Sequence, residues 1–145
     1  MRNSIALITV FSGILRRKDY QVFIRMENIH AKREEAAVNW EKATGIAFEI
    51  GKSKLAESRT ELFHKAAEYA RIRVEWQLSP PDERLRMDER RRLVHNEFIE
   101  TCEAMSRNMQ EEGEDVSWKK ELGHDRKEIG DFACYIHLIL GLVAR

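Results

Sequence analysis

Three arginines interrupt the apolar stripes of the expected helices, which makes them the side chains best placed to do chemistry. Arg33, Arg73 and Arg91 each lie between apolar residues that recur at three- and four-residue spacing. Removing a guanidinium from water is costly unless an acid, an aromatic face or a ligand compensates its charge. In one interpretation the three arginines keep their heads in solvent at stripe edges or pair with glutamates. In the other they converge at one end of a helical bundle and bind an anion.

A second pattern lies in the same segment, where four residues separate Arg90 from His95 and Asn96 follows. The spacing resembles the R-x4-6-H signature of HEPN proteins, small all-α dimers of which some are metal-independent ribonucleases. The resemblance implies a histidine that acts as acid or base and an arginine that stabilises charge on the phosphate. The sequence departs from the family pattern, because Arg91 directly follows Arg90 and because Arg90 and His95 point well apart on an ideal helix. Arg91 lies one turn before His95 and is therefore better placed than Arg90 to cooperate with it. The alternative is a half-buried histidine beside a solvated arginine face.

The same stretch is dense in arginine, which favours binding of phosphate backbones by electrostatics alone. The arginines concerned are Arg84, Arg86, Arg90, Arg91 and Arg92. Acidic residues are interleaved with them and reduce the local positive field; these are Asp82, Glu83, Asp88 and Glu89. Nucleic-acid binding without catalysis is therefore kept as an alternative to cleavage.

Glutamate precedes histidine by three residues at several positions, a spacing found in di-iron helical bundles. The pairs are Glu27/His30, Glu61/His64 and Glu121/His124. Glu61 and His64 fall on the side of their helix away from Leu62, so they are expected to face water. No Gly-rich phosphate loop or zinc spacing occurs either. The sequence predicts no metal site and no cofactor.

The expected last helix is apolar on two faces, which is typical of a helix at the centre of a bundle or shared with a partner. Between these faces runs a stripe of Gly130, Cys134, His137 and Gly141. Beside the stripe lies a second apolar face of Tyr135, Leu138 and Leu142. These seven residues are the predicted interface of a homodimer or of a complex with another protein. Burial within the chain is the alternative.

Start and stop signals divide the chain into four main helices and predict antiparallel neighbours. The first helix is expected to begin near Asp19 and to end at Gly51, with Ser53 as the N-cap of the second. Ser79 is the expected N-cap of the third helix, with proline at its first position. The third helix is expected to end at an acidic link, residues 111–114.

Two shorter signals follow. Residues 117–122 predict a single helical turn ended by Gly123, and Asp125 with Glu128 forms a capping box for the last helix. The predicted architecture is one all-α, four-helix bundle-like domain over residues 19–145. Residues 1–18 precede it as an apolar arm that is either a strand or an extension.

Composition supports a single domain of 145 residues, with 43% hydrophobic residues and 25 basic against 25 acidic side chains. The balanced charge gives no global attraction to nucleic acid or anionic lipid. Cys102 and Cys134 lack disulfide or metal-ligand spacing, which fits reduced thiols in the cytoplasm. The apolar run from Ile5 to Leu15 is too short to cross a bilayer as a helix, so stable membrane insertion is not expected.

A wider resemblance is carried by residues 117–123, 125–136 and 95–99. These segments resemble a family of small uncharacterised proteins from Gram-positive bacteria and their conjugative elements. The resemblance implies a bacterial cytoplasm, an all-α fold and a mobile-element accessory role, and it implies no activity. We expect a non-enzymatic interaction or regulatory module that forms a homodimer. The alternatives are ribonuclease chemistry at Arg91, His95 and Arg90, or nucleic-acid binding through the third helix.

Overall fold

The computed structural model describes the backbone of residues 30–143 and the side chains of residues 39–141. Within these bounds the chain forms helices and no strand, which confirms the all-α prediction. The helices are α3 (His30–Gly51), α4 (Ala56–Leu78), α5 (Pro81–Glu111), α6 (Ser117–Leu122) and α7 (Arg126–Val143). The expected arm at residues 1–18 and the expected helix start at Asp19 lie outside the described residues.

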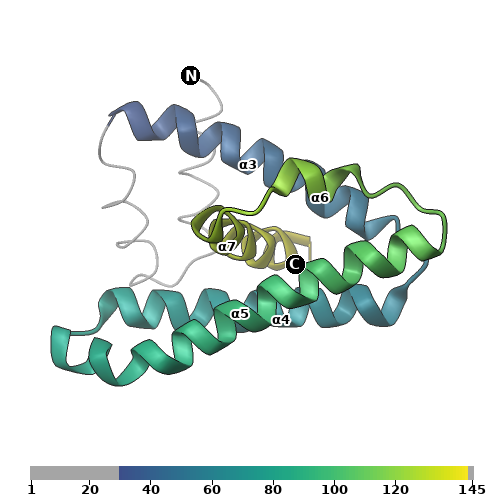
Figure 1. Ribbon diagram of the computed structural model, residues 1–145. Helices are drawn as coiled ribbons and strands as arrows, with labels where there is room; N and C mark the ends of the chain where they lie inside the picture. The colour runs from purple at the N-terminus through teal and green to yellow at the C-terminus, as the bar shows by residue number, and fades with distance from the viewer. Residues whose placement is uncertain (1–29, 144–145) are drawn as a thin grey trace.

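The helices pack in layers, with α7 between the others (Figure 1). An antiparallel hairpin of α4 and α5 forms one side of the molecule, and α3 with the short α6 forms the other. Helix α7 crosses between these two sides and packs against both. This placement covers both apolar faces of α7 within one chain.

Helices α3 and α4 run in opposite directions but diverge from their tight connection instead of packing along each other (Figure 1). The prediction of antiparallel neighbours therefore holds for the α4–α5 hairpin and not for α3 and α4. The physical reason is that α7 occupies the space between them. None of the helices in the described part of the chain is both long and apolar enough to cross a membrane.

The core lies where α7 meets the hairpin and α6. Phe98 of α5 and Phe132 of α7 have ring centroids 6.3 Å apart, and both are buried. Trp118 of α6 is 1% exposed and closes the end of the core near the α5–α6 connection. The remaining core side chains are mostly aliphatic and come from every helix: Ile46, Ile50, Leu62, Met105, Met109, Leu122, Ile129 and Ile136. Burial of these residues is the main favourable term that holds the layers together.

The predicted end of α3 is confirmed, because Gly51 is the last residue of that helix. Two predicted N-caps are wrong. Ser53 is not the N-cap of α4, which begins at Ala56. Its hydroxyl accepts a hydrogen bond from the Leu55 N–H at 3.1 Å and donates to a Glu114 carboxylate oxygen at 2.8 Å. Ser53 therefore links the α3–α4 and α5–α6 connections.

Ser79 also differs from its expected role as the N-cap of α5. The residue before a proline is pushed to extended backbone, and Pro80 has φ −66° and ψ 161° before Pro81. The helix therefore begins at Pro81, and Ser79 lies one position too early to cap it. The Ser79 hydroxyl instead donates to the Glu75 carbonyl at 2.7 Å, at the end of α4.

The remaining helix ends follow the sequence. Gly113, with φ 75°, ends α5: the Gly113 N–H donates to the Gln110 carbonyl at 3.0 Å and the Glu114 N–H to the Met109 carbonyl at 2.9 Å. Gly123, with φ 77°, ends α6 as expected. Asp125 caps α7 by accepting a hydrogen bond from the Glu128 N–H at 3.0 Å.

Gly130 of α7 lies against the side chains of Tyr69 and Arg73 of α4. A Cβ atom at this position would lie 2.9 Å from the Tyr69 hydroxyl oxygen, 3.0 Å from Tyr69 Cε1 and 3.3 Å from Arg73 Nη1. Such distances are shorter than ordinary van der Waals contact. Tyr69 is 2% exposed and has little room to move. The missing side chain of Gly130 therefore sets the spacing of the two helices.

We expect Gly130→Ala to lower the free energy of unfolding by about 1–3 kcal/mol, because overpacking outweighs the higher helix propensity of alanine. Gly45→Ala is the matched control, since a Cβ at this exposed position of α3 meets no atom within 4 Å. That variant should gain about 0.5–1 kcal/mol. Urea denaturation of both variants measures the difference. Equal stabilisation by the two substitutions would contradict the close contact.

Candidate functional site

A polar cluster lies at the junction of α4, α5 and α7, within an otherwise apolar interior. Its centre is an ion pair between Arg73 of α4 and Asp131 of α7, whose Nη2 and Oδ1 atoms are 2.6 Å apart. The two side chains are 13% and 25% exposed. A guanidinium with so little access to water needs its carboxylate partner, because removal of one member leaves the other unpaired and desolvated.

His95 of α5 is held in the same cluster by two contacts. Its Nε2 atom lies 2.9 Å from the carbonyl oxygen of Arg126, at the start of α7. Its ring stacks on Tyr69, with centroids 4.5 Å apart and planes inclined by 23°. A carbonyl oxygen only accepts hydrogen bonds, so Nε2 carries the proton and donates it. His95 therefore ties the start of α7 to the hairpin.

The electrostatics of the cluster keep His95 neutral. Burial lowers the pKa of His95 below its ordinary value of 6.5, and the nearby charges of Arg126, Arg73 and Arg91 lower it further. The hydrogen bond to the Arg126 carbonyl opposes these effects without reversing them. Burial likewise raises the pKa of Tyr69, so its hydroxyl keeps its proton at neutral pH.

Arg73 also contacts Cys134, whose Sγ atom is 3.9 Å from Nη1. Burial acts to lower the pKa of Arg73, but its contacts with Cys134, Asp131 and Tyr69 raise it more, so the guanidinium is charged. Burial raises the pKa of Cys134, against the opposing effect of Arg73. Burial also raises the pKa of Cys102, to about 12. Both thiols are therefore protonated at neutral pH and are poor nucleophiles.

Two arginines of the predicted nucleic-acid-binding segment pack on the ring of Trp76 at the edge of the cluster. The guanidinium carbons of Arg84 and Arg91 lie 4.7 and 4.4 Å from the centroid of its ring. Arg84 also donates to the Trp76 carbonyl at 2.9 Å and to the Gln77 carbonyl at 2.7 Å, and so caps the end of α4. The Trp76 indole N–H donates to Asp88 Oδ1 at 2.7 Å.

The structure brings Arg91 and His95 to one cluster and leaves Arg90 outside it. Arg90 is exposed, whereas Arg91 is half-buried on Trp76. The Nε2 atom of His95 is already bonded, and 8% of the residue is exposed. This geometry suits a structural histidine better than an acid–base catalyst, which needs its proton within reach of a substrate.

The five arginines of α5 do not form one basic strip. Arg84 and Arg91 turn inward onto Trp76, and Arg86 pairs with Asp82 at 3.3 Å on the outer surface. Arg90 and Arg92 are exposed and, two residues apart on a helix, point in widely different directions. A phosphate backbone laid along α5 would therefore meet a minority of these charges at once. The side chain of Arg33 lies outside the described residues.

The residues of the predicted partner interface on α7 pack largely against other helices of the same chain. Gly130 and Leu138 are buried, and Gly130 contacts Tyr69 and Arg73. The half-buried members of the set are Cys134, Tyr135, His137 and Gly141, and the side chain of Leu142 lies outside the described residues. Tyr135 packs edge-on against Trp40 of α3, with centroids 5.9 Å apart. The surplus apolar face of α7 is thus covered by α3 and α4.

Sequence reasoning missed Tyr69, Arg126 and Asp131 as members of the cluster. The role of Asp131 could have been predicted from the sequence, because an acid inside an apolar helix needs a buried cation as its partner. Tyr69 was assigned to the apolar stripe of α4, and its hydroxyl gave no sign of a polar neighbour. The part played by Arg126 comes from its backbone carbonyl, which no side-chain pattern reports.

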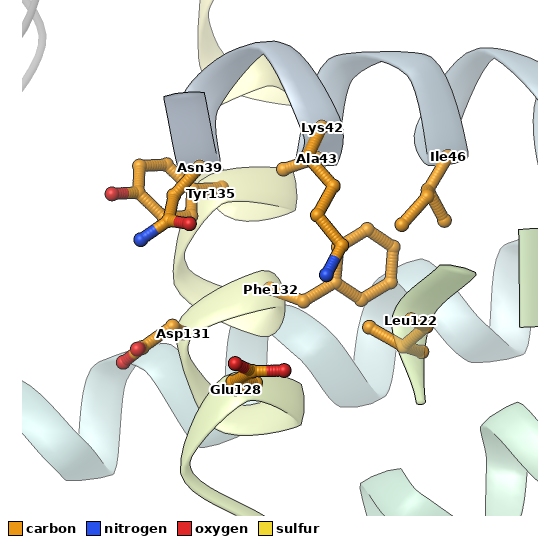
Figure 2. A pocket seen from close by; sticks show the side chains of 9 residues that line it. All are labelled: Asn39, Lys42, Ala43, Ile46, Leu122, Glu128, Asp131, Phe132 and Tyr135. Atoms are coloured by element: carbon orange, nitrogen blue, oxygen red, sulfur yellow. The ribbon is translucent and has the colours of Figure 1, made fainter. Parts of the chain in front are cut away.

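A shallow depression opens between α3 and α7, beside the cluster (Figure 2). Ala43, Ile46 and Phe132 form its apolar floor, and Lys42 and Glu128 lie at its polar rim. Asp131 also reaches this rim, but its carboxylate is already bound to Arg73. In the described part of the chain no three His, Cys, Asp or Glu side chains are grouped so that they could hold a metal ion.

The chain matches no family model, no curated protein and no solved structure. Its function is therefore inferred from the geometry of its own residues.

The lowered pKa of His95 predicts a pH-dependent stability. Below pH 6.5 the unfolded chain binds a proton at this histidine more readily than the folded chain does. The free energy of unfolding therefore decreases as the pH is lowered. The contribution is present above pH 6.5 and is lost as the pH falls toward the folded pKa. We expect His95→Gln to flatten this part of the profile, and His64→Gln, at an exposed position, to leave it unchanged. Urea denaturation from pH 5 to 8 tests this, and identical profiles for the three proteins would contradict it.

Proposed function

We propose that this chain is a non-catalytic helical interaction module that self-associates through the outer face of α5. Support comes first from the polar cluster, whose groups bind one another. Arg73 binds Asp131, His95 binds the Arg126 carbonyl and Tyr69 stacks on His95. Such mutual pairing is what a structural network needs and leaves few groups to act on a substrate.

The observation that carries the proposal is the exposure of two leucines on α5. Leu85 is 76% exposed and Leu93 is 57% exposed, although most large aliphatic side chains of the described region are buried or half-buried. They lie eight residues apart, which is about 12 Å along the helix axis. Glu89 lies midway between them on the same ridge of the helix. This ridge faces away from α4 and α7.

The ridge is self-complementary when two copies of α5 pack antiparallel with Glu89 at the two-fold axis. Leu85 of one copy then lies opposite Leu93 of the other, and the reverse pair forms on the other side of the axis. The two glutamates meet at the axis, which weakens the interface. Arg86 and Arg92 of the facing copy lie within one turn of each glutamate and offset part of this repulsion. The geometry therefore supports a weak dimer.

This proposal fits the structure better than the two alternatives. Cleavage of RNA would need a histidine nitrogen open to substrate, and the Nε2 atom of His95 is bonded inside the chain. Nucleic-acid binding would need a basic strip, and α5 distributes its arginines around the helix with acids between them. A protein partner requires neither feature.

The test is the mass of the protein in solution over a concentration series. We expect wild-type protein to dimerise reversibly. The double variant Leu85→Lys/Leu93→Lys should stay monomeric, because lysines replace the apolar contact with like charges. Glu89→Leu should associate more tightly, since it removes the repulsion at the axis and adds apolar area. Sedimentation velocity measures all three.

Phe48→Lys is the matched control, because Phe48 is 63% exposed on α3, on another face of the molecule. This variant should dimerise like the wild type. A wild-type monomer at every concentration would refute self-association. Equal disruption by Phe48→Lys would show that the outer face of α5 is not the interface.

A further inference from the structure

The depression between α3 and α7 has the size and the lining of a site for a small molecule. The space within it, including the part open to solvent, is about 340 Å³. Ligand pockets have volumes of about 300–1,000 Å³, so a molecule that fits here has few heavy atoms. Ala43, Ile46 and Phe132 of its floor belong to the buried core, and Leu122 of α6 adds to this apolar surface (Figure 2).

Two opposite charges stand at the rim of the depression, one on each of the two helices. The half-buried Lys42 extends from α3 toward α7, and the exposed Glu128 lies on α7 (Figure 2). Among the residues that the structure describes, neither charged group has an ion-pair or hydrogen-bond partner. The Lys42 Nζ atom and the Glu128 carboxylate oxygens are also more than 4.0 Å apart. A ligand therefore meets an unpaired cation on one side and an unpaired anion on the other.

The other polar side chains at this rim do not cancel these two charges. Asp131 is bound to Arg73, with 2.6 Å between Oδ1 and Nη2. Asn39 lies one turn before Lys42 on α3 and carries a neutral amide that reaches the same opening (Figure 2). An amide both donates and accepts hydrogen bonds, so Asn39 can orient a polar ligand without changing the charge of the site.

We propose that the depression binds a free α-amino acid with an aliphatic side chain, in its zwitterionic form. The carboxylate of the ligand contacts Lys42 and the Asn39 amide, its ammonium group contacts Glu128, and its side chain lies on the apolar floor. Charge-assisted hydrogen bonds at both ends fix the orientation of the ligand. A ligand with a single charge would leave either Lys42 or Glu128 unpaired. The pattern of charges therefore favours a zwitterion over a fatty acid or an amine.

This site does not rest on the proposed self-association, because the depression is lined by α3, α6 and α7 and the leucine ridge lies on α5. Ligand binding is therefore measured on the Leu85→Lys/Leu93→Lys variant as well as on the wild type. The two proteins should bind the ligand equally, whatever their masses. An affinity lost in this variant would contradict a site on α3 and α7.

The experiment is a titration with L-leucine at neutral pH, followed through the backbone amide resonances of Ala43 and Phe132. Parallel titrations use isocaproate, which is leucine without its ammonium group, and isoamylamine, which is leucine without its carboxylate. Glycine serves as the zwitterion without a side chain. We expect saturable shifts that are tightest for leucine. No saturable shift with leucine would overturn the proposal, and so would equal affinity for isocaproate, isoamylamine or glycine.

Two substitutions test the contacts separately. Lys42→Gln and Glu128→Gln should each weaken leucine binding by about tenfold, the loss expected for one charge-assisted hydrogen bond. Lys42→Gln should leave the affinity for isoamylamine unchanged, and Glu128→Gln the affinity for isocaproate. Lys54→Gln and Glu100→Gln are the matched controls, since both residues are exposed and neither lines the depression. Equal losses in these controls would show that leucine does not bind between Lys42 and Glu128.

A second measurement is independent of the resonances. A ligand that binds only the folded chain and contacts both α3 and α7 raises the melting temperature as its concentration increases. We expect L-leucine to raise the melting temperature of the wild type and of both control variants. An equal rise in the double variant Lys42→Gln/Glu128→Gln would contradict the proposed site.

Discussion

The contact of Tyr69 with Gly130 is the constraint on which the rest of the structure depends. It lets α7 approach α4 closely enough for Arg73 to reach Asp131 at 2.6 Å. The same approach places the Arg126 carbonyl beside His95, so that α4, α5 and the start of α7 share one network. A larger residue at position 130 would separate the helices and leave several desolvated polar groups without partners.

The position of α7 also determines which surfaces are free. An apolar helix between two layers buries the side chains that would otherwise attract a partner, and α3 covers the face around Tyr135. The exposed apolar residues then lie on α5 and α3. The inner side of α5 carries Arg91, which packs on the ring of Trp76, and its outer side carries Leu85 and Leu93. Helix α5 thus carries a cationic side chain on its inner side and apolar side chains on its outer side.

Local sequence patterns predicted the helices and several of their ends. They could not predict which residues far apart in the sequence pair with one another. Gly123 and Asp125 acted as expected because a left-handed glycine and a capping carboxylate work within a few residues. Ser79 failed because two following prolines shifted the helix start by one position. The two apolar faces of α7 were visible in the sequence, but periodicity cannot tell a second layer of the same chain from another molecule. The pairing of Arg73 with Asp131 depends on how α7 crosses α4, which no spacing along the chain encodes.

The most direct test of this account is a double-mutant cycle on Arg73→Met and Asp131→Leu, read as free energies of unfolding. If the ion pair fixes α7 against α4, each single variant loses more stability than the double variant, and the coupling energy exceeds about 1 kcal/mol. Single losses that simply add, with coupling near zero, would contradict the pair and the central position of α7 that it supports.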